Sequence, residues 1–176
     1  MINRKATIKI AKALGDLNNE VVFVGGAMVS LYIDDPAAED IRPTKDIDLT
    51  FQITTVGKLE QLREALINKG FNQSHDDDII CRFRYEGILV DVMSTLRVGW
   101  APSNRWFMPG FQKAVDYNLD EVLIKILPLP YFLASKMDAF FDRGIKDLYG
   151  SHDFEDILYI LNYTSTFGEQ MSTADK

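Results

Sequence analysis

Residues 21–51 decide the fold and read VVFVGGAMVSLYIDDPAAEDIRPTKDIDLTF. An apolar run ends in Gly25-Gly26, a short helical segment follows, and Asp46 and Asp48 then lie inside a second apolar run. Side chains alternate between the two faces of a strand, so both carboxylates point to one face and the apolar residues between and after them point to the other. Two neighbouring carboxylates repel each other unless they share a proton or a cation. The pair therefore indicates Mg²⁺ and phosphate chemistry.

The composition indicates a globular intracellular protein. A chain of 176 residues with 47% hydrophobic content can bury the core of one domain, which we expect over about residues 20–162, with a frayed polar tail over 164–176. Cys81 is the one cysteine, which excludes an internal disulfide and favours a structural thiol in a reducing compartment. No stretch approaches the roughly 18 apolar residues that span a bilayer. We therefore expect a cytoplasmic protein without a membrane partner.

The charge balance is acidic. Asp and Glu number 26 against 19 Lys and Arg, which gives a formal net charge of −7. Proteins that wrap nucleic acid usually carry the opposite sign, so the balance disfavours extensive binding to RNA or DNA. We interpret acidic pairs such as Asp34-Asp35 as solvated turns.

Periodicity and turn residues predict an alternation of helices with antiparallel hairpins. The predicted helices cover residues 3–17, 27–32, 56–69, 131–141 and 154–162. The predicted strands cover residues 21–24, 46–51, 79–85 and 88–94, followed by a hairpin of 114–115 with 121–126. This order indicates an α+β fold with a mixed β-sheet flanked by helices.

Asp91 is an isolated acid in the middle of the apolar strand 88–94. A buried charge at this position is unfavourable unless it is paired or bound to a metal. One interpretation makes Asp91 a third metal ligand beside the first two acids. The other places it on an exposed strand edge or in a salt bridge with Arg82 or Arg84 of the neighbouring strand. The strand alone favours neither.

The helix over residues 131–143 carries two cations on its apolar side. At about 100° per residue, Lys136 and Arg143 fall within the apolar arc that runs from Phe132 to Phe141 and includes Met137. Ser135 falls on the narrow polar side. Inward cations need an anionic partner, which we expect to be a triphosphate or a carboxylate of the cleft. The alternative is that their long stems let the charged ends reach water.

The last helix begins with Asp153 and Asp156, which fall on or beside its apolar face. Acids are common in the first turn of a helix, and Ser151 or Asp153 can cap it. A role in orienting Lys136 or Arg143 is the second interpretation.

These motifs together resemble the nucleotidyltransferase superfamily with the DNA polymerase β-like fold. The motifs are the glycine pair at 25–26, the TKDIDL run at 44–49, Asp91, the lysine helix at 136–143 and the D-x-x-D pattern at 153–156. The last two motifs are similar to the branch that contains the AbiEii-type toxins and related small nucleotidyltransferases. The resemblance covers roughly residues 20–162.

The resemblance implies a set of roles for these residues. Asp46 and Asp48 would bind two Mg²⁺ ions, or Mn²⁺, that bridge the triphosphate of an NTP. Asp91 would match the third acid, which helps to activate the acceptor hydroxyl. The residues assigned to the nucleotide site are Gly25, Gly26, Thr44, Lys45, Lys136, Arg143, Asp153 and Asp156.

We therefore expect a Mg²⁺-dependent nucleotidyltransferase that moves an NMP from an NTP to a hydroxyl of tRNA or other RNA, a protein or a small molecule. A toxin of this branch would also have an antitoxin protein as a partner. The alternative is a catalytically silent relative that binds nucleotide or a partner protein. Many superfamily members have Gly-Ser in place of Gly25-Gly26, so a serine hydroxyl that helps to fix a phosphate is missing here. The Gly-Gly version is typical of the toxin-like branch.

Overall fold

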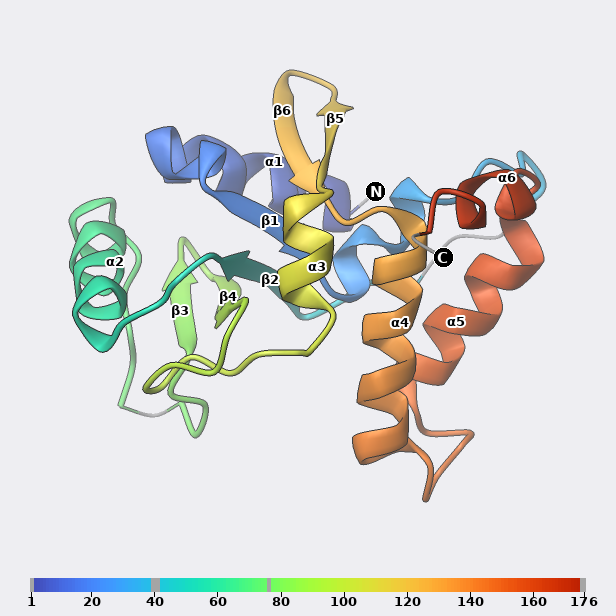
Figure 1. Cartoon of the computed structure of the whole chain (residues 1–176). Coiled ribbons are helices and arrows are strands. Elements are labelled where there is room, and N and C mark those ends of the chain that lie inside the picture. Colours follow the sequence, from blue (N-terminus) through green and yellow to red (C-terminus); the bar gives the residue numbers. More distant parts are fainter. Residues whose placement is uncertain (1, 39–41, 76, 175–176) are drawn as a thin grey trace.

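The computed structural model describes residues 2–38, 42–75 and 77–174, which build one six-stranded sheet with helices around it (Figure 1). The strand order is β3-β4-β2-β1-β6-β5. The strands are β1 (Val21–Val24), β2 (Asp46–Phe51), β3 (Arg82–Tyr85), β4 (Ile88–Ser94), β5 (Val115–Leu119) and β6 (Val122–Ile126). β1 pairs with β2 antiparallel and with β6 parallel, and β2 pairs with β4 parallel. The predicted mixed α+β sheet is confirmed.

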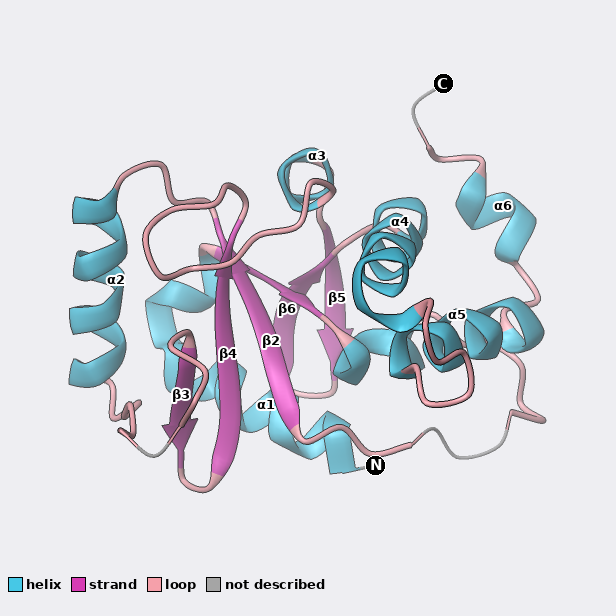
Figure 2. Ribbon diagram, turned by 90° about the horizontal axis from the view of Figure 1, so that it is seen from below, coloured by secondary structure: helices cyan, strands magenta, loops and turns pink. Residues whose placement is uncertain are grey.

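The helices lie around the sheet, at both of its ends (Figure 2). They are α1 (Ile2–Leu14), α2 (Val56–Asn68), α3 (Phe107–Gln112), α4 (Leu129–Ala139), α5 (His152–Tyr163) and α6 (Phe167–Met171). Two 3₁₀ segments, Gly15–Asn19 and Gly26–Leu31, flank β1, and a π-helical turn, Phe140–Gly144, continues α4. Figure 2 shows α2 beside β3 at one end, and α4 next to α5 at the other. None of these helices is both long and apolar enough to cross a bilayer.

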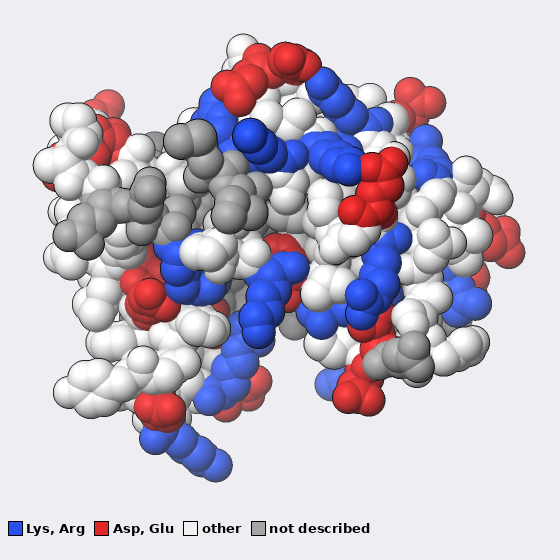
Figure 3. Space-filling model, turned by 180° about the vertical axis from the view of Figure 1, so that it is seen from behind, with Lys and Arg blue, Asp and Glu red and all other residues white. Residues whose placement is uncertain are grey.

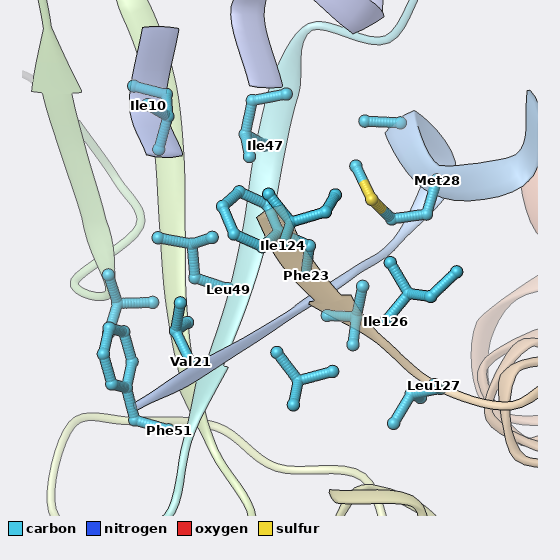
Figure 4. Close-up of a cluster of buried hydrophobic side chains, with 14 of the residues drawn as sticks. Ile10, Val21, Phe23, Met28, Ile47, Leu49, Phe51, Ile124, Ile126 and Leu127 are labelled. Atoms are coloured by element: carbon cyan, nitrogen blue, oxygen red, sulfur yellow. The ribbon is translucent and has the colours of Figure 1, made fainter. Parts of the chain in front are cut away.

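The core lies on the face of β2 that the alternating pattern predicts. Ile47, Leu49 and Phe51 are at most 3% exposed, and Figure 4 shows the first two beside Ile10 of α1 and Phe23 of β1. Full burial of such side chains contributes about 1.5–3 kcal/mol each. This packing fixes the rotation of β2, so Asp46 and Asp48 must point to the opposite face.

Three strands differ in extent from the prediction, and in β6, which begins at Val122 and not at residue 121, the difference is a single residue. The pattern predicts a strand over residues 79–85, whereas β3 begins at Arg82, because its N–H donates to the carbonyl of Ile79 (3.1 Å) and closes a turn. The first strand of the last hairpin extends to Leu119, beyond the two residues that the pattern marks. Most of β5 is exposed, so no burial pattern reveals it, and its pairing with β6 defines it.

The predicted apolar arc of α4 is wrong in its second half. Met137 and Phe141 are 46% and 57% exposed, whereas Ser135, which we placed on the polar side, is buried. The Ser135 hydroxyl donates to the carbonyl of Phe132 (2.7 Å), which satisfies it inside the protein. The first turns of α4, from Leu129 onward, are buried on all sides, so a single apolar stripe does not describe this helix.

The tail that we expected to fray from residue 164 instead contains α6. The Asp34 carboxylate accepts hydrogen bonds from the N–H and hydroxyl of Ser165 (2.6 and 2.8 Å) and from the N–H and hydroxyl of Thr166. These bonds, that of the Thr166 hydroxyl first, lower the pKa of Asp34 to about 2. Asp34 therefore anchors the start of α6 and is more than a solvated turn residue.

Candidate active site

A row of charged side chains crosses three neighbouring strands on the polar face of the sheet. Asp48 of β2 is the register partner of Asp91 in β4, and Asp91 is the register partner of Arg82 in β3. Register partners point to the same face, so the three side chains lie side by side. The sequence motif placed two acids on one strand, and the parallel β2–β4 pairing adds the third.

Gly25 leaves room for the Asp48 carboxylate. The preceding residue, Val24, is the register partner of Asp48. Gly25 itself has φ +74° and ψ −172°. A Cβ atom on Gly25 would lie 1.7 Å from Oδ2 of Asp48. Both the backbone conformation and the space therefore require glycine.

The second glycine has a different neighbour. A Cβ atom on Gly26 would lie 2.8 Å from Cγ2 of Thr44. Thr44 is itself held by Asn3 of α1, whose Oδ1 accepts from the Thr44 N–H (2.9 Å). Gly26 therefore lets the segment before β2 pack against the glycine turn.

Asp48 is in an unfavourable place for a lone negative charge. Burial, and then the charge of Asp46, raise its pKa to about 7. The charge of Asp91 acts in the same direction, whereas Lys136 and Arg143 act against it. The negative charges on this face are therefore only partly compensated by the cations around them.

Arg82 is the cation closest to the acidic row. Its Nε and Nη2 each donate to an oxygen of Asp91 (2.7 Å in both cases), and Nη2 also donates to Oδ2 of Asp46 (3.0 Å). These bonds, that of Asp91 first, raise the pKa of Arg82. Of the two arginines that we considered for Asp91, the structure selects Arg82, because Arg84 pairs with Asp77 (2.6 and 2.9 Å).

A second charged cluster joins α4 to α5. Lys136, 7% exposed, donates to Oδ1 of Asp153 (3.2 Å) and Oδ2 of Asp156 (2.7 Å). Arg143 donates to Oδ2 of Asp153 (2.9 Å), and Arg42 donates to Oδ1 of Asp156 (3.1 Å). The expected anionic partners of the two helix cations are thus the two acids of the last helix. The side chain of Arg143 is 70% exposed, so it lies at the rim and not inward as predicted.

The π-helical turn carries Arg143 toward α5. A Cβ atom on Gly144 would lie 2.3 Å from Oγ of Ser151, the residue that caps α5 by accepting from the N–H of Phe154 (3.3 Å). Gly144 thus allows the end of α4 to approach the start of the helix that carries Asp153. Isolated π turns occur often at functional sites.

The two clusters face each other across a cleft of about 800 Å³. Among the predicted site residues, those that line it are Gly25, Asp48, Asp91, Lys136, Arg143 and Asp153. Its other lining residues include Ser103 and Asn104, which no sequence pattern singled out. The predicted site residues outside its lining are Gly26, Thr44, Lys45, Asp46 and Asp156. The structure therefore joins most of the sequence motifs in one place and puts the others behind or beside it.

Cys81 also lines this cleft. Burial, and then the charge of Asp91, raise its pKa to about 11. The thiol is therefore neutral near pH 7 and has the structural character that the sequence predicts.

Three acids on this face have the chemistry of metal ligands. Carboxylate oxygens are the ligands that Mg²⁺ prefers, and Asp46, Asp48 and Asp91 supply them on one face. Within the ranges that the structure describes, however, no three His, Cys, Asp or Glu side chains are arranged to hold a metal ion. The guanidinium of Arg82 lies between Asp46 and Asp91. The chemistry of the acids fits a divalent cation, and their present arrangement holds an arginine.

The sequence alone could have identified Arg82, and not Arg84, as the partner of Asp91. The two-residue turn Glu86-Gly87 fixes the hairpin register, and counting back from it places Arg82 opposite Asp91. No sequence pattern predicts the contact of Arg42 with Asp156, because Arg42 lies in a loop far from Asp156 in sequence.

Comparisons with known proteins agree with this geometry. A family model described as nucleotidyl transferase AbiEii toxin of type IV toxin–antitoxin systems matches residues 11–175. The chain belongs to this family. It is thus a nucleotidyltransferase of the toxin–antitoxin class, as its motifs indicate. No match was found among curated proteins.

Solved structures share the fold at low sequence identity. A crystal structure of an antigenic nucleotidyltransferase-like protein from Paracoccidioides brasiliensis has 18% identity and a TM-score of 0.56, covering 92% of this chain and 76% of its own. The solution structure of the antibiotic-resistance factor ANT(2'')-Ia has 14% identity and a TM-score of 0.57, covering 98% and 89%. Both similarities support the nucleotidyltransferase fold.

Proposed function

We propose that the chain transfers an NMP from an NTP to a hydroxyl group of an acceptor, with help from divalent cations. The observation that supports this best is the row of Asp48 and Asp91 beside Gly25, on the floor of a cleft whose far wall carries Lys136 and Arg143. Acids on one wall and cations on the other suit a triphosphate held between metal ions and basic side chains.

The acids have separate roles in this proposal. Asp46 and Asp48 would hold Mg²⁺ or Mn²⁺, which would neutralise charge on the triphosphate and polarise the α-phosphorus. Asp91 would accept the proton of the acceptor hydroxyl. A bond then forms between that oxygen and the α-phosphorus, the bond from the α-phosphorus to the bridging oxygen breaks, and pyrophosphate leaves. Gly25 would let the α-phosphate approach the backbone beside Asp48.

The basic wall would stabilise the leaving pyrophosphate. Arg143 lies at the rim with a largely exposed side chain and shares Asp153 with Lys136, so it can turn toward a bound phosphate. Lys136 is held by two buried acids. We assign it two roles, which are to position the basic wall and to contribute a positive charge to it.

The predicted nucleotide residues outside the cleft lining act as supports in this proposal. Gly26 and Thr44 hold the segment before β2 against the glycine turn, and Asp156 holds Lys136 and Arg42. Lys45 is exposed immediately before β2, where it can contact an acceptor.

The acceptor remains a hydroxyl of RNA such as tRNA, of a protein or of a small molecule, and the family implies an antitoxin as a further partner. Figure 3 shows basic side chains beside acidic ones on the face seen from behind. Among the described residues, the ion pairs Lys12–Glu121 and Lys125–Asp116 are exposed. Such a surface supports a small or locally bound acceptor better than a long nucleic acid.

One observation favours a second function. The Arg82–Asp91 pair ties up a proposed catalytic acid, as expected of a relative that binds nucleotide without turnover. Detectable turnover that depends on a divalent cation would dismiss this alternative.

The experiment is label transfer from each of four α-phosphate-labelled NTPs into a cell extract, with Mg²⁺ or Mn²⁺. We expect transfer by the native protein and none by Asp46→Asn or Asp48→Asn, because neither amide replaces a carboxylate ligand. Asp116→Asn, an exposed acid far from the cleft lining, is the matched control and should retain transfer. Separation of RNA, protein and small molecules then identifies the acceptor class. Full activity of both Asp46→Asn and Asp48→Asn would contradict the proposed mechanism.

A further inference from the structure

Arg82 lies between Asp46, a proposed metal ligand, and Asp91, the proposed proton acceptor beside it. It makes two hydrogen bonds to Asp91 and one to Asp46, and its side chain is only 16% exposed. The planar guanidinium matches the two oxygens of one carboxylate, so Arg82 and Asp91 form a bidentate ion pair, which is a strong interaction. The hairpin register holds its backbone directly opposite Asp91.

A guanidinium and a divalent cation compete for the same carboxylate oxygens, because both take up their lone pairs and the two positive charges repel each other. Both oxygens of Asp91 and one of Asp46 are hydrogen-bonded to Arg82. A cation that bridges these acids therefore competes with Arg82, and the repulsion between the two positive charges favours the departure of the guanidinium. Hydrogen bonds between charged groups are among the stronger ones in proteins, so a weakly bound ion must first overcome them.

The chain also provides a place for the displaced side chain. Arg82 lines a separate hollow of about 610 Å³, whose lining includes Asp77 and Asp78. Asp77 already pairs with Arg84, which lies two residues along the same strand. A carboxylate pair close to the present position of Arg82 gives it an alternative acidic partner.

We propose that Arg82 is an internal cation that closes the metal site until a divalent ion arrives with the triphosphate. The inference rests on the proposed function, because it concerns the regulation of the same site. In the free protein Arg82 pairs with Asp91 and Asp46, and in the loaded protein it turns toward the hollow beside Asp77. The arginine thus keeps the acids compensated and lowers the affinity of the empty cleft for a free metal ion.

The test is Mn²⁺ binding to the protein without nucleotide, followed by electron paramagnetic resonance of the free ion. Arg82→Gln should bind Mn²⁺ at least about tenfold more tightly than the native protein, since tenfold corresponds to about 1.4 kcal/mol. Arg84→Gln removes a cation from the same strand and should change the affinity less than about twofold. The double variant Arg82→Gln/Asp91→Asn should lose the gain, which locates the ion at the acids.

Unchanged or weaker Mn²⁺ binding by a folded Arg82→Gln protein would overturn the inference. A second measurement on the native protein does not depend on the folding of that variant. The NMR signal of the Arg82 Nε–H should shift when Mg²⁺ and a non-hydrolysable NTP analogue are added. A signal that keeps its position while the Asp48 amide shifts would show that Arg82 does not leave.

The two proposals fail in different ways. Transfer by the native protein together with unchanged Mn²⁺ affinity in Arg82→Gln would overturn the role of Arg82 alone. Tighter Mn²⁺ binding without transfer from any NTP would uphold that role and move the function toward nucleotide binding.

Discussion

Gly25 and Asp48 show how closely single residues depend on each other in this cleft. Glycine is required both by its backbone conformation and by the Asp48 carboxylate, which occupies the space of a Cβ atom. The glycine turn therefore shapes the acidic site before any phosphate arrives. The conformation of the turn and the position of the acid are one feature and not two.

Gly25→Ala should abolish transfer and lower the free energy of unfolding by about 1–3 kcal/mol or more, because it adds a clash to an unfavourable backbone conformation. Gly87→Ala is the matched control, since Gly87 also has a positive φ (+82°) but no atom lies within 4 Å of the added Cβ. It should be destabilised by backbone strain alone and retain transfer. Urea unfolding and the label assay measure both effects. Equal transfer by the two variants would contradict the proposed role of Gly25.

At the scale of elements, the α4–α5 contact depends on a buried charge cluster. Lys136→Met should lower the free energy of unfolding by about 3 kcal/mol, because it leaves Asp153 and Asp156 without their shared buried cation. Lys125→Met removes an exposed pair with Asp116 and should change it by less than about 1 kcal/mol. Urea unfolding compares the two. Similar values for both would mean that the cluster does not hold the helices together.

The attachment of α6 should depend on pH through Asp34. Its pKa is about 2 in the folded chain against an ordinary value of 3.8, so the carboxylate stabilises the fold above 3.8, and this stabilisation is lost as the pH falls through about 2. Asp34→Asn cannot accept the same four hydrogen bonds and should melt at a lower temperature near neutral pH. The difference in melting temperature from the native protein should shrink between about pH 4 and pH 2. A difference that is constant over this range would exclude the carboxylate as its cause.

At the scale of the whole molecule, the strands were easier to predict than the contacts between helices. β1, β2 and β4 have the predicted bounds, because alternation and the flanking glycines mark buried strands directly. Only packing could show that Asp153 and Asp156 receive Lys136, since α4 and α5 are joined by a loop without a pattern. No sequence pattern predicts the π-helical turn or α6, because tertiary contacts stabilise them.

The family predicts a consequence for the cell. Induced expression of the native chain should arrest growth, and Asp46→Asn should not, because the arrest would require nucleotidyl transfer. Asp116→Asn should arrest growth as the native chain does. Growth curves after induction, with protein levels matched by immunoblot, measure this. Arrest by Asp46→Asn at equal levels would separate toxicity from catalysis.

The most direct test of the central claim follows both ends of the triphosphate. Purified protein is given its acceptor with the preferred NTP, labelled at the α-phosphate in one reaction and at the γ-phosphate in another. The α-label should enter the acceptor and the γ-label should appear as an equal amount of pyrophosphate, whereas Asp48→Asn should do neither. Transfer of the γ-label to the acceptor, or equal α-label transfer by Asp48→Asn, would contradict the central claim.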